Sequence, residues 1–266
     1  MRINQTLDVL SKGEVAFGCA IQCYRSPEIA GALAAAGFDY VFIDTEHGGF
    51  GFETVQDMIG AAARSGITPV VRVGELLYSL VSRLLDVGAQ GIVFPRVEDA
   101  AALEEALSWV RYPPQGVRGF GILPQYINYE QRSMKEVIAH MNSNTMTVVQ
   151  FETVPALERA NEILSLPGVD VAMVGPADLS IALGVPGELE HPKMIEAIER
   201  LIVQANEHGV VPGIQTRTVE QAQFWTERGM RFVGAGGEHG LLLAKAREAV
   251  KTLRGTKVPQ AMPAAQ

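Results

Sequence analysis

Eight short runs of apolar residues alternate with longer segments of helical composition, and this alternation restricts the fold more than any other feature. The apolar runs occupy residues 15–21, 40–43, 68–72, 90–94, 146–151, 169–174, 210–214 and 231–234. They are too continuous to be antiparallel strands with one face in water, so they predict a parallel sheet covered on both faces. Helical patterns lie between them, for instance at 26–36, 52–64, 76–86 and 98–110. Together they predict a single-domain (β/α)8 TIM barrel.

Glycine positions support this division. Gly37, Gly66, Gly88, Gly168, Gly209 and Gly229 each follow a helix-like stretch and precede a strand, where a helix-terminating glycine is expected. The alternative fold is a doubly wound open sheet, which usually carries a glycine-rich dinucleotide loop that residues 17–24 lack. We expect the barrel to cover residues 1–255 and the tail 256–266 to be mobile. The long irregular stretch 112–128 has a length typical of functional loops.

Composition excludes several classes of protein. The net charge of −8 argues against nucleic acid as a partner. No apolar run approaches the ~20 residues that span a bilayer, and the first residues lack the apolar core of a signal peptide, so we expect a cytoplasmic protein without a membrane partner. Cys19 and Cys23 form no disulfide framework, and no second Cys or His pair stands beside them at zinc-site spacing.

Polar side chains follow several predicted strands at the point where each strand ends. Asp44, Glu46 and His47 come at or just after the end of the second run, Arg72 ends the third, Glu152 directly follows the fifth, and Asp178 follows the sixth. In a parallel barrel all these ends lie on one rim, where active sites are built. A histidine, an arginine and carboxylates on one rim suit metal-assisted acid–base chemistry.

Each of these residues has a second interpretation. Glu152 and Asp178 can ligate a hard cation such as Mg²⁺ or Mn²⁺, or they are solvated acids at loop starts. His47 can be a general base, or an ordinary loop histidine. Arg72 can meet an anionic substrate or enolate, or it forms an internal ion pair with Asp44 or Glu46.

The positions of the lysines distinguish between two possible catalytic mechanisms. None of Lys12, Lys135, Lys193, Lys245, Lys251 and Lys257 stands at a predicted strand end. A Schiff-base aldolase needs a lysine facing its substrate. The sequence therefore favours a metal as the electron sink of any carbon–carbon bond cleavage.

Six segments resemble the HpcH/HpaI family of metal-dependent (class II) pyruvate aldolases. They are residues 42–47, 69–72, 85–90, 111–119, 149–152 and 175–180, in the order that the family has them. The resemblance implies reversible cleavage of a 4-hydroxy-2-oxo acid to pyruvate and an aldehyde, through a metal-stabilised pyruvate enolate. It also implies a lyase that binds Mg²⁺, Mn²⁺ or Co²⁺ and assembles as a homohexamer, in which neighbouring subunits complete each site.

The resemblance assigns roles residue by residue. Glu152 and Asp178 would ligate the metal, and Gln150 and the backbone at Ala177 would hold the substrate. His47 would accept the proton, directly or through a metal-bound water. Asp86 would raise the basicity of His47, and Arg72 would stabilise negative charge in the transition state.

Three segments depart from the family pattern. Cys19 and Ala20 stand where an aromatic residue is common, Thr45 replaces a glycine, and Glu238-His239 replaces Asp-Thr. These changes leave the aldehyde, the stereochemistry, the pathway and the cellular metal open. Alternative functions are an oxaloacetate decarboxylase, a thioester lyase on the same scaffold, or a non-catalytic barrel that binds 2-oxo acids.

Overall fold

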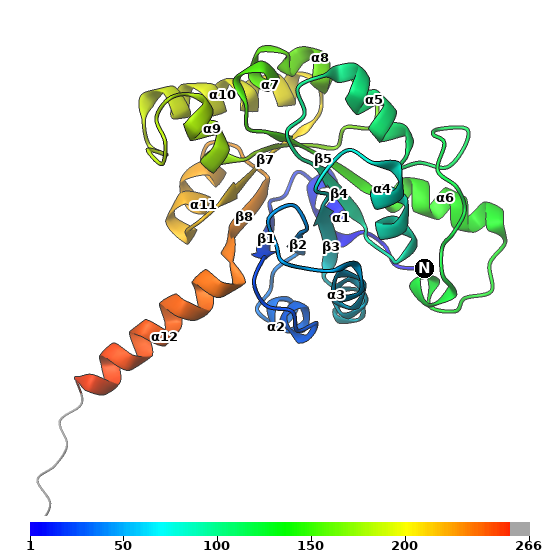
Figure 1. The fold of residues 1–266 in the computed structure, drawn as a ribbon, viewed down its shortest axis with the longest axis horizontal. Coiled ribbons are helices and arrows are strands. Elements are labelled where there is room, and N and C mark those ends of the chain that lie inside the picture. The colour runs from blue at the N-terminus through cyan, green and yellow to red at the C-terminus, as the bar shows by residue number, and fades with distance from the viewer. Residues whose placement is uncertain (256–266) are drawn as a thin grey trace, which may run out of the picture.

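The eight predicted strands form a closed parallel barrel in the computed structural model, which describes residues 1–255 (Figure 1). The strands are β1 (Ala16–Ile21), β2 (Tyr40–Asp44), β3 (Thr68–Arg72), β4 (Gly91–Phe94), β5 (Met146–Phe151), β6 (Val171–Val174), β7 (Val211–Thr216) and β8 (Phe232–Gly237). Each strand pairs in parallel with the next, and β8 pairs with β1. The predicted TIM barrel is therefore confirmed. The expected mobile tail, 256–266, lies outside the described residues.

Helices surround the barrel and connect its strands. They are α1 (Gln5–Ser11), α2 (Glu28–Ala35), α3 (Phe52–Ser65), α4 (Tyr78–Asp86), α5 (Ala100–Ser108), η1 (Pro124–Ile127), α6 (Met134–Asn144), α7 (Val154–Glu158), α8 (Ala160–Leu164), α9 (Pro176–Ala182), α10 (Pro192–Glu207), α11 (Val219–Thr226) and α12 (Glu238–Arg254). The six glycines expected after helices all have positive φ, which explains why glycine stands there. Among residues 1–255, none of the helices has both the length and the apolar character that a membrane crossing requires.

Two hydrophobic layers stabilise the barrel. The outer layer lies between the strands and the helices, and the inner layer fills the barrel itself. In the inner layer Tyr40 stacks on Phe232 with ring centroids 4.1 Å apart. Gly18 must lack a side chain, because a Cβ there would overlap the Tyr40 ring. Leu10 of α1 packs against this layer, so the short N-terminal helix, which the sequence did not predict, helps to close the interior.

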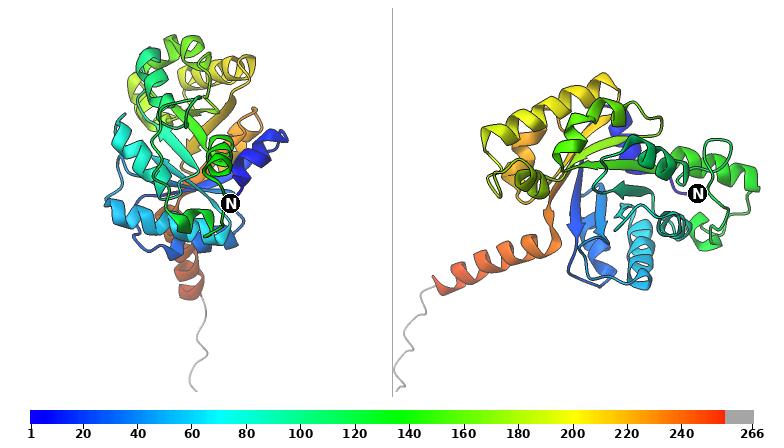
Figure 2. Two further views of the ribbon diagram at one scale, coloured as in Figure 1. Left: turned by 90° about the vertical axis from the view of Figure 1, so that its right-hand side faces the viewer. Right: turned by 45° about the horizontal axis from the view of Figure 1, so that its top comes forward.

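α12 leaves the barrel instead of covering it. Figures 1 and 2 show this last helix projecting away from the other elements in every view. Its only buried residue is Glu238, whereas α10, of similar length, buries six residues against the barrel. The sequence did not predict this projection, since nothing in the helix's own pattern fixes the direction in which it leaves β8.

Strand register places the polar strand ends side by side on one rim. Asp44 pairs with Arg72 across the β2–β3 ladder. Gln150 pairs with Met173 across the β5–β6 ladder, so the turn after β6 lies beside the end of β5. The rim residues named from the sequence therefore face a common centre.

Candidate active site

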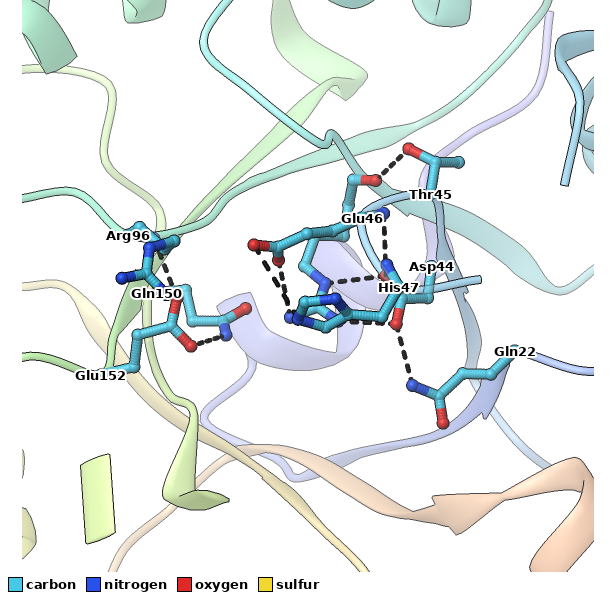
Figure 3. Close-up of polar contacts among 9 residues, drawn as sticks. Gln22, Asp44, Thr45, Glu46, His47, Arg96, Gln150 and Glu152 are labelled. Atoms are coloured by element: carbon cyan, nitrogen blue, oxygen red, sulfur yellow. Dashed lines mark hydrogen bonds and ion pairs between the residues drawn. The ribbon is translucent and has the colours of Figure 1, made fainter. Parts of the chain in front are cut away.

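A cavity of about 510 Å³ opens at the carboxyl ends of the strands. Five residues expected at the site line it directly: His47, Arg72, Gln150, Ala177 and Asp178. Glu152 lies beside it and receives a short hydrogen bond from the side-chain amide of Gln150. The barrel thus gathers all the expected metal and substrate residues around one cavity, and Figure 3 shows His47, Gln150 and Glu152 among them.

Asp44 organises one side of this cavity. Its buried Oδ1 accepts the backbone N–H groups of Glu46 and His47 at 3.1 and 3.2 Å. Its Oδ2 accepts the side-chain amide of Gln22 at 2.8 Å. Arg72 donates Nε to Oδ1 at 2.9 Å and Nη2 to Oδ2 at 2.6 Å. Burial alone would raise the pKa of Asp44, but these donors outweigh it and hold the pKa below its usual value.

Arg72 also forms an ion pair with a second carboxylate, through its remaining nitrogen. Its Nη1 lies 3.0 Å from Oε2 of Glu46, whose side chain is 10% exposed. Burial would lower the pKa of Arg72, but Asp44 and Glu46 raise it, so the guanidinium is fixed as a cation. The internal ion pair that the sequence left open is therefore present, on a guanidinium that also lines the cavity.

Glu46 has a larger part in the site than the sequence reasoning gave it. The sequence named it as a neighbour of His47 and as a possible ion-pair partner of Arg72, and its carboxylate contacts Arg72 through Oε2 and lies 4.0 Å from Nε2 of His47 through Oε1. Figure 3 shows Glu46 beside His47. The available signal was its position two residues beyond a strand-ending Asp44, where a loop residue can turn back over the barrel mouth.

Glu152 and Gln150 form the opposite side of the cavity. Glu152 is buried, and its Oε1 accepts the backbone N–H of Arg96 at 2.9 Å. Oε1 of Gln150 is also buried and has no hydrogen-bond partner within residues 1–255. Gly175 keeps space for both side chains, because a Cβ there would lie 2.6 Å from Glu152 Oε2 and 2.7 Å from Gln150 Nε2.

Electrostatics at Glu152 fit a divalent cation. Burial raises the pKa of Glu152, and the negative charges of Asp178 and Glu46 raise it further. Asp178 lies in the first turn of α9, directly after Ala177. Carboxylate oxygens with an unpartnered carboxamide oxygen nearby are ligands that Mg²⁺ and Mn²⁺ prefer. The residues present therefore fit such an ion.

His47 and Asp86 have different interaction partners. The His47 ring is 63% exposed, and its Nε2 lies 4.0 Å from Oε1 of Glu46. Asp86, the last residue of α4, instead accepts Nη2 of the buried Arg118 at 2.8 Å. No hydrogen bond joins Asp86 to His47 within the part of the chain that the structure describes, so the support of His47 by Asp86 stays a prediction.

Thr45, one of the departures from the family pattern, ties the loop after β2 to β3. Its backbone N–H and its hydroxyl both donate to the carbonyl of Arg72, at 3.1 and 2.5 Å. A glycine could supply only the first of these bonds. Threonine therefore strengthens the attachment of the loop that presents Glu46 and His47.

Comparisons with known proteins identify the family. The family model described as HpcH/HpaI aldolase/citrate lyase matches residues 23–244. The chain is 33% identical over 237 residues to the 2-dehydro-3,6-dideoxy-6-sulfogluconate aldolase of Pseudomonas putida, covering 89% of this chain and 92% of that protein. It is 36% identical over 231 residues to the 4-hydroxy-2-oxo-heptane-1,7-dioate aldolase of Escherichia coli, covering 87% of each.

A solved structure agrees with these sequence comparisons. The HpcH/HpaI aldolase from Desulfitobacterium hafniense DCB-2 superposes with a TM-score of 0.88 at 31% identity, covering 97% of this chain and 98% of that one. The chain belongs to the HpcH/HpaI aldolase/citrate lyase family. Membership implies a divalent-metal cofactor, in agreement with the oxygen ligands around Glu152.

Replacing Glu152 by Gln tests the cation site. Because folding raises the pKa of Glu152, its ionisation opposes folding, and the penalty grows as the pH rises through the folded-state pKa. Without divalent ions the Glu152→Gln protein should therefore melt higher than wild type at pH 7, and this advantage should shrink at pH 4. The unpartnered oxygen of Gln150 can accept the new amide if its carboxamide turns over.

Divalent ions should reverse the order of the two melting temperatures, so that wild type melts higher than Glu152→Gln. Mg²⁺ or Mn²⁺ at about 100 times its dissociation constant should stabilise wild type by about 2.7 kcal/mol, and Glu152→Gln far less. Thermal unfolding with EDTA and with each ion measures both effects, with the exposed Glu158→Gln as the control. Equal stabilisation of wild type and Glu152→Gln by the ion would remove Glu152 from the metal site.

Proposed function

We propose that this protein is a class II pyruvate aldolase, which reversibly cleaves a 4-hydroxy-2-oxo acid to pyruvate and an aldehyde. The observation that carries the proposal is the cavity lined by Asp178, the cationic Arg72 and the exposed His47, with the buried Glu152 beside it. A non-catalytic binder of 2-oxo acids would need the cation and the arginine. It would not need a histidine held at the mouth of the cavity.

Glu152 and Asp178 would hold Mg²⁺, Mn²⁺ or Co²⁺, with Gln150 and the backbone at Ala177 holding the 2-oxo acid. When bound, the ion supplies the Lewis acidity that stabilises negative charge on the enolate. Arg72 adds a fixed positive charge at the same place, and its bonds to Asp44 keep it there without reorganisation.

His47 performs the proton transfer in this scheme. Its ring takes the proton of the 4-hydroxyl group, the C3–C4 bond breaks, and the aldehyde leaves. The electron pair of that bond becomes the double bond of the pyruvate enolate, and His47 returns its proton to C3 to give pyruvate. Asp44 holds the backbone of His47, so it is a positioning residue for the base.

Arg217 indicates the chemistry of the aldehyde. Its exposed side chain lines the cavity. The two relatives named above act, by their names, on a sulfogluconate derivative and a heptane-1,7-dioate, and both substrates carry an anionic group remote from the 2-oxo acid. We therefore assign Arg217 to the recognition of an aldehyde that carries a terminal anion.

A second copy of the chain is the partner that α12 requires. Leu242, Val250 and Leu253 are 57%, 47% and 70% exposed, and with Ala246 they form one stripe along the helix. Phe17 of β1 is 40% exposed and faces outward, because its neighbour Gly18 faces the barrel interior. We propose a homo-oligomer, a hexamer by family resemblance, in which α12 covers apolar surface of another copy.

Replacing His47 by Ala separates binding from proton transfer. Pyruvate should still bind, because Glu152, Asp178 and Arg72 remain. Exchange of its methyl protons with solvent should fall by about 10²- to 10⁴-fold, the usual contribution of a general base. NMR measures both, with the exposed His208→Ala as the control. Exchange at the wild-type rate would refute the assignment of His47 as the base.

Replacing Arg217 by Gln tests the aldehyde assignment. In the synthetic direction KM for an aldehyde with a terminal carboxylate should rise by about 10- to 100-fold, as expected for a lost charge-assisted hydrogen bond. KM for a neutral aldehyde such as propanal should change little. The exposed Arg200→Gln on α10 is the control. An equal rise in KM for both aldehydes would show that Arg217 does not recognise the terminal anion.

Replacing Leu242 by Glu tests the role of α12. Light scattering of the wild-type protein should give a mass of several chains, and the variant should shift toward smaller species, because a charge buried at an interface without a partner is strongly destabilising. Lys251→Glu, on the same helix, is the control for charge. A monomeric wild type would contradict the proposed oligomer.

A further inference from the structure

A second group of potential metal ligands lies where α12 leaves the barrel. Cys23 belongs to the loop after β1, and Glu238 and His239 are the first two residues of α12. Their ligand atoms all lie within 4.8 Å of one another. The group does not include Glu152 or Asp178, but its His239 also lines the cavity of the candidate aldolase site.

Glu238 is held rigidly with one oxygen unused. Its side chain is 0% exposed, and Oε1 accepts the backbone N–H groups of Gln22, Cys23 and Tyr24 at 3.0, 2.5 and 3.0 Å. Oε2 has no hydrogen-bond partner among residues 1–255 and lies 3.6 Å from Nδ1 of His239. A buried oxygen without a partner destabilises the folded protein, and a cation at this point would satisfy it.

The spacing is close to that of a tetrahedral site. With bonds of about 2.0–2.3 Å, ligand atoms around Zn²⁺ lie roughly 3.3–3.8 Å apart. Cys23 and His239 are both exposed, so their side chains can rotate inward by the small distance required. Glu238 needs no movement, because its backbone partners already orient the carboxylate.

The ligand types select the cation. A thiolate, an imidazole and a carboxylate suit Zn²⁺ or Co²⁺, whereas Mg²⁺ prefers six oxygen ligands. The charges of the thiolate and the carboxylate balance those of a divalent ion. Three protein ligands leave a fourth position for water, and binding releases the thiol proton.

We propose that Cys23, Glu238 and His239 form a thiolate-containing Zn²⁺ site, distinct from the aldolase metal, that clamps the loop after β1 to the first turn of α12. Two of the three ligands begin the helix, so the ion fixes the direction in which α12 projects. The departure of Glu238-His239 from the family pattern is then explained by the ligands that this second metal site requires.

Titration of the reduced, metal-free, full-length protein with Co²⁺ tests this site. Excess Mg²⁺ is present to occupy the Glu152–Asp178 pair. We expect a near-ultraviolet thiolate-to-Co²⁺ charge-transfer band that saturates at one ion per chain and is displaced by Zn²⁺. The band should disappear in Cys23→Ser, and the Co²⁺ affinity should fall at least about tenfold in His239→Ala.

Matched variants separate this site from other binding. Cys19→Ala, which removes the other cysteine, should keep the band, and so should Glu152→Gln, whether or not the protein is an aldolase. Absence of the band in wild type, its persistence in Cys23→Ser, or its loss in Glu152→Gln would each overturn the proposal.

Discussion

The buried ion pair between Asp44 and Arg72 is the constraint on which the rest of the site depends. Two strand-end side chains meet in a bidentate contact, and the same carboxylate holds the backbone of Glu46 and His47. A buried ion pair stabilises only when its remaining hydrogen-bonding positions are filled. Gln22 and the two backbone N–H groups fill them here. The pair thus fixes the positions of His47, Glu46 and Arg72 at the neighbouring ends of β2 and β3.

Charge balance at the site agrees with the divalent-metal cofactor that family membership implies. Arg72 is paired with two carboxylates, Asp44 and Glu46, so these three side chains together carry a net negative charge. Glu152 and Asp178 bring further negative charge to the same cavity, and the raised pKa of Glu152 records the resulting repulsion together with burial. Such strain is typical of a binding site whose ligand completes it. A divalent cation between the two carboxylates would remove this repulsion.

The parts that could be predicted from sequence are those fixed by local patterns. Apolar runs located the strands, and parallel pairing then placed Arg72, Gln150 and Glu152 on one rim, because strand ends in a barrel share a side. Contacts between distant segments could not be predicted. Asp86 meets Arg118 from a long loop whose path no local pattern fixes. Closure of β8 on β1 brings Glu238 to the backbone of Cys23, and the projection of α12 depends on that junction.

Exchange of deuterium from solvent into the methyl group of pyruvate tests the central claim most directly, because it reports enolate formation without any choice of aldehyde. NMR would follow the wild-type protein with Mg²⁺ or Mn²⁺ and again with EDTA. Exchange that requires the divalent ion is the predicted result. No exchange with any divalent ion, in a protein that still binds pyruvate, would contradict the enolate mechanism and favour the non-catalytic binder of 2-oxo acids.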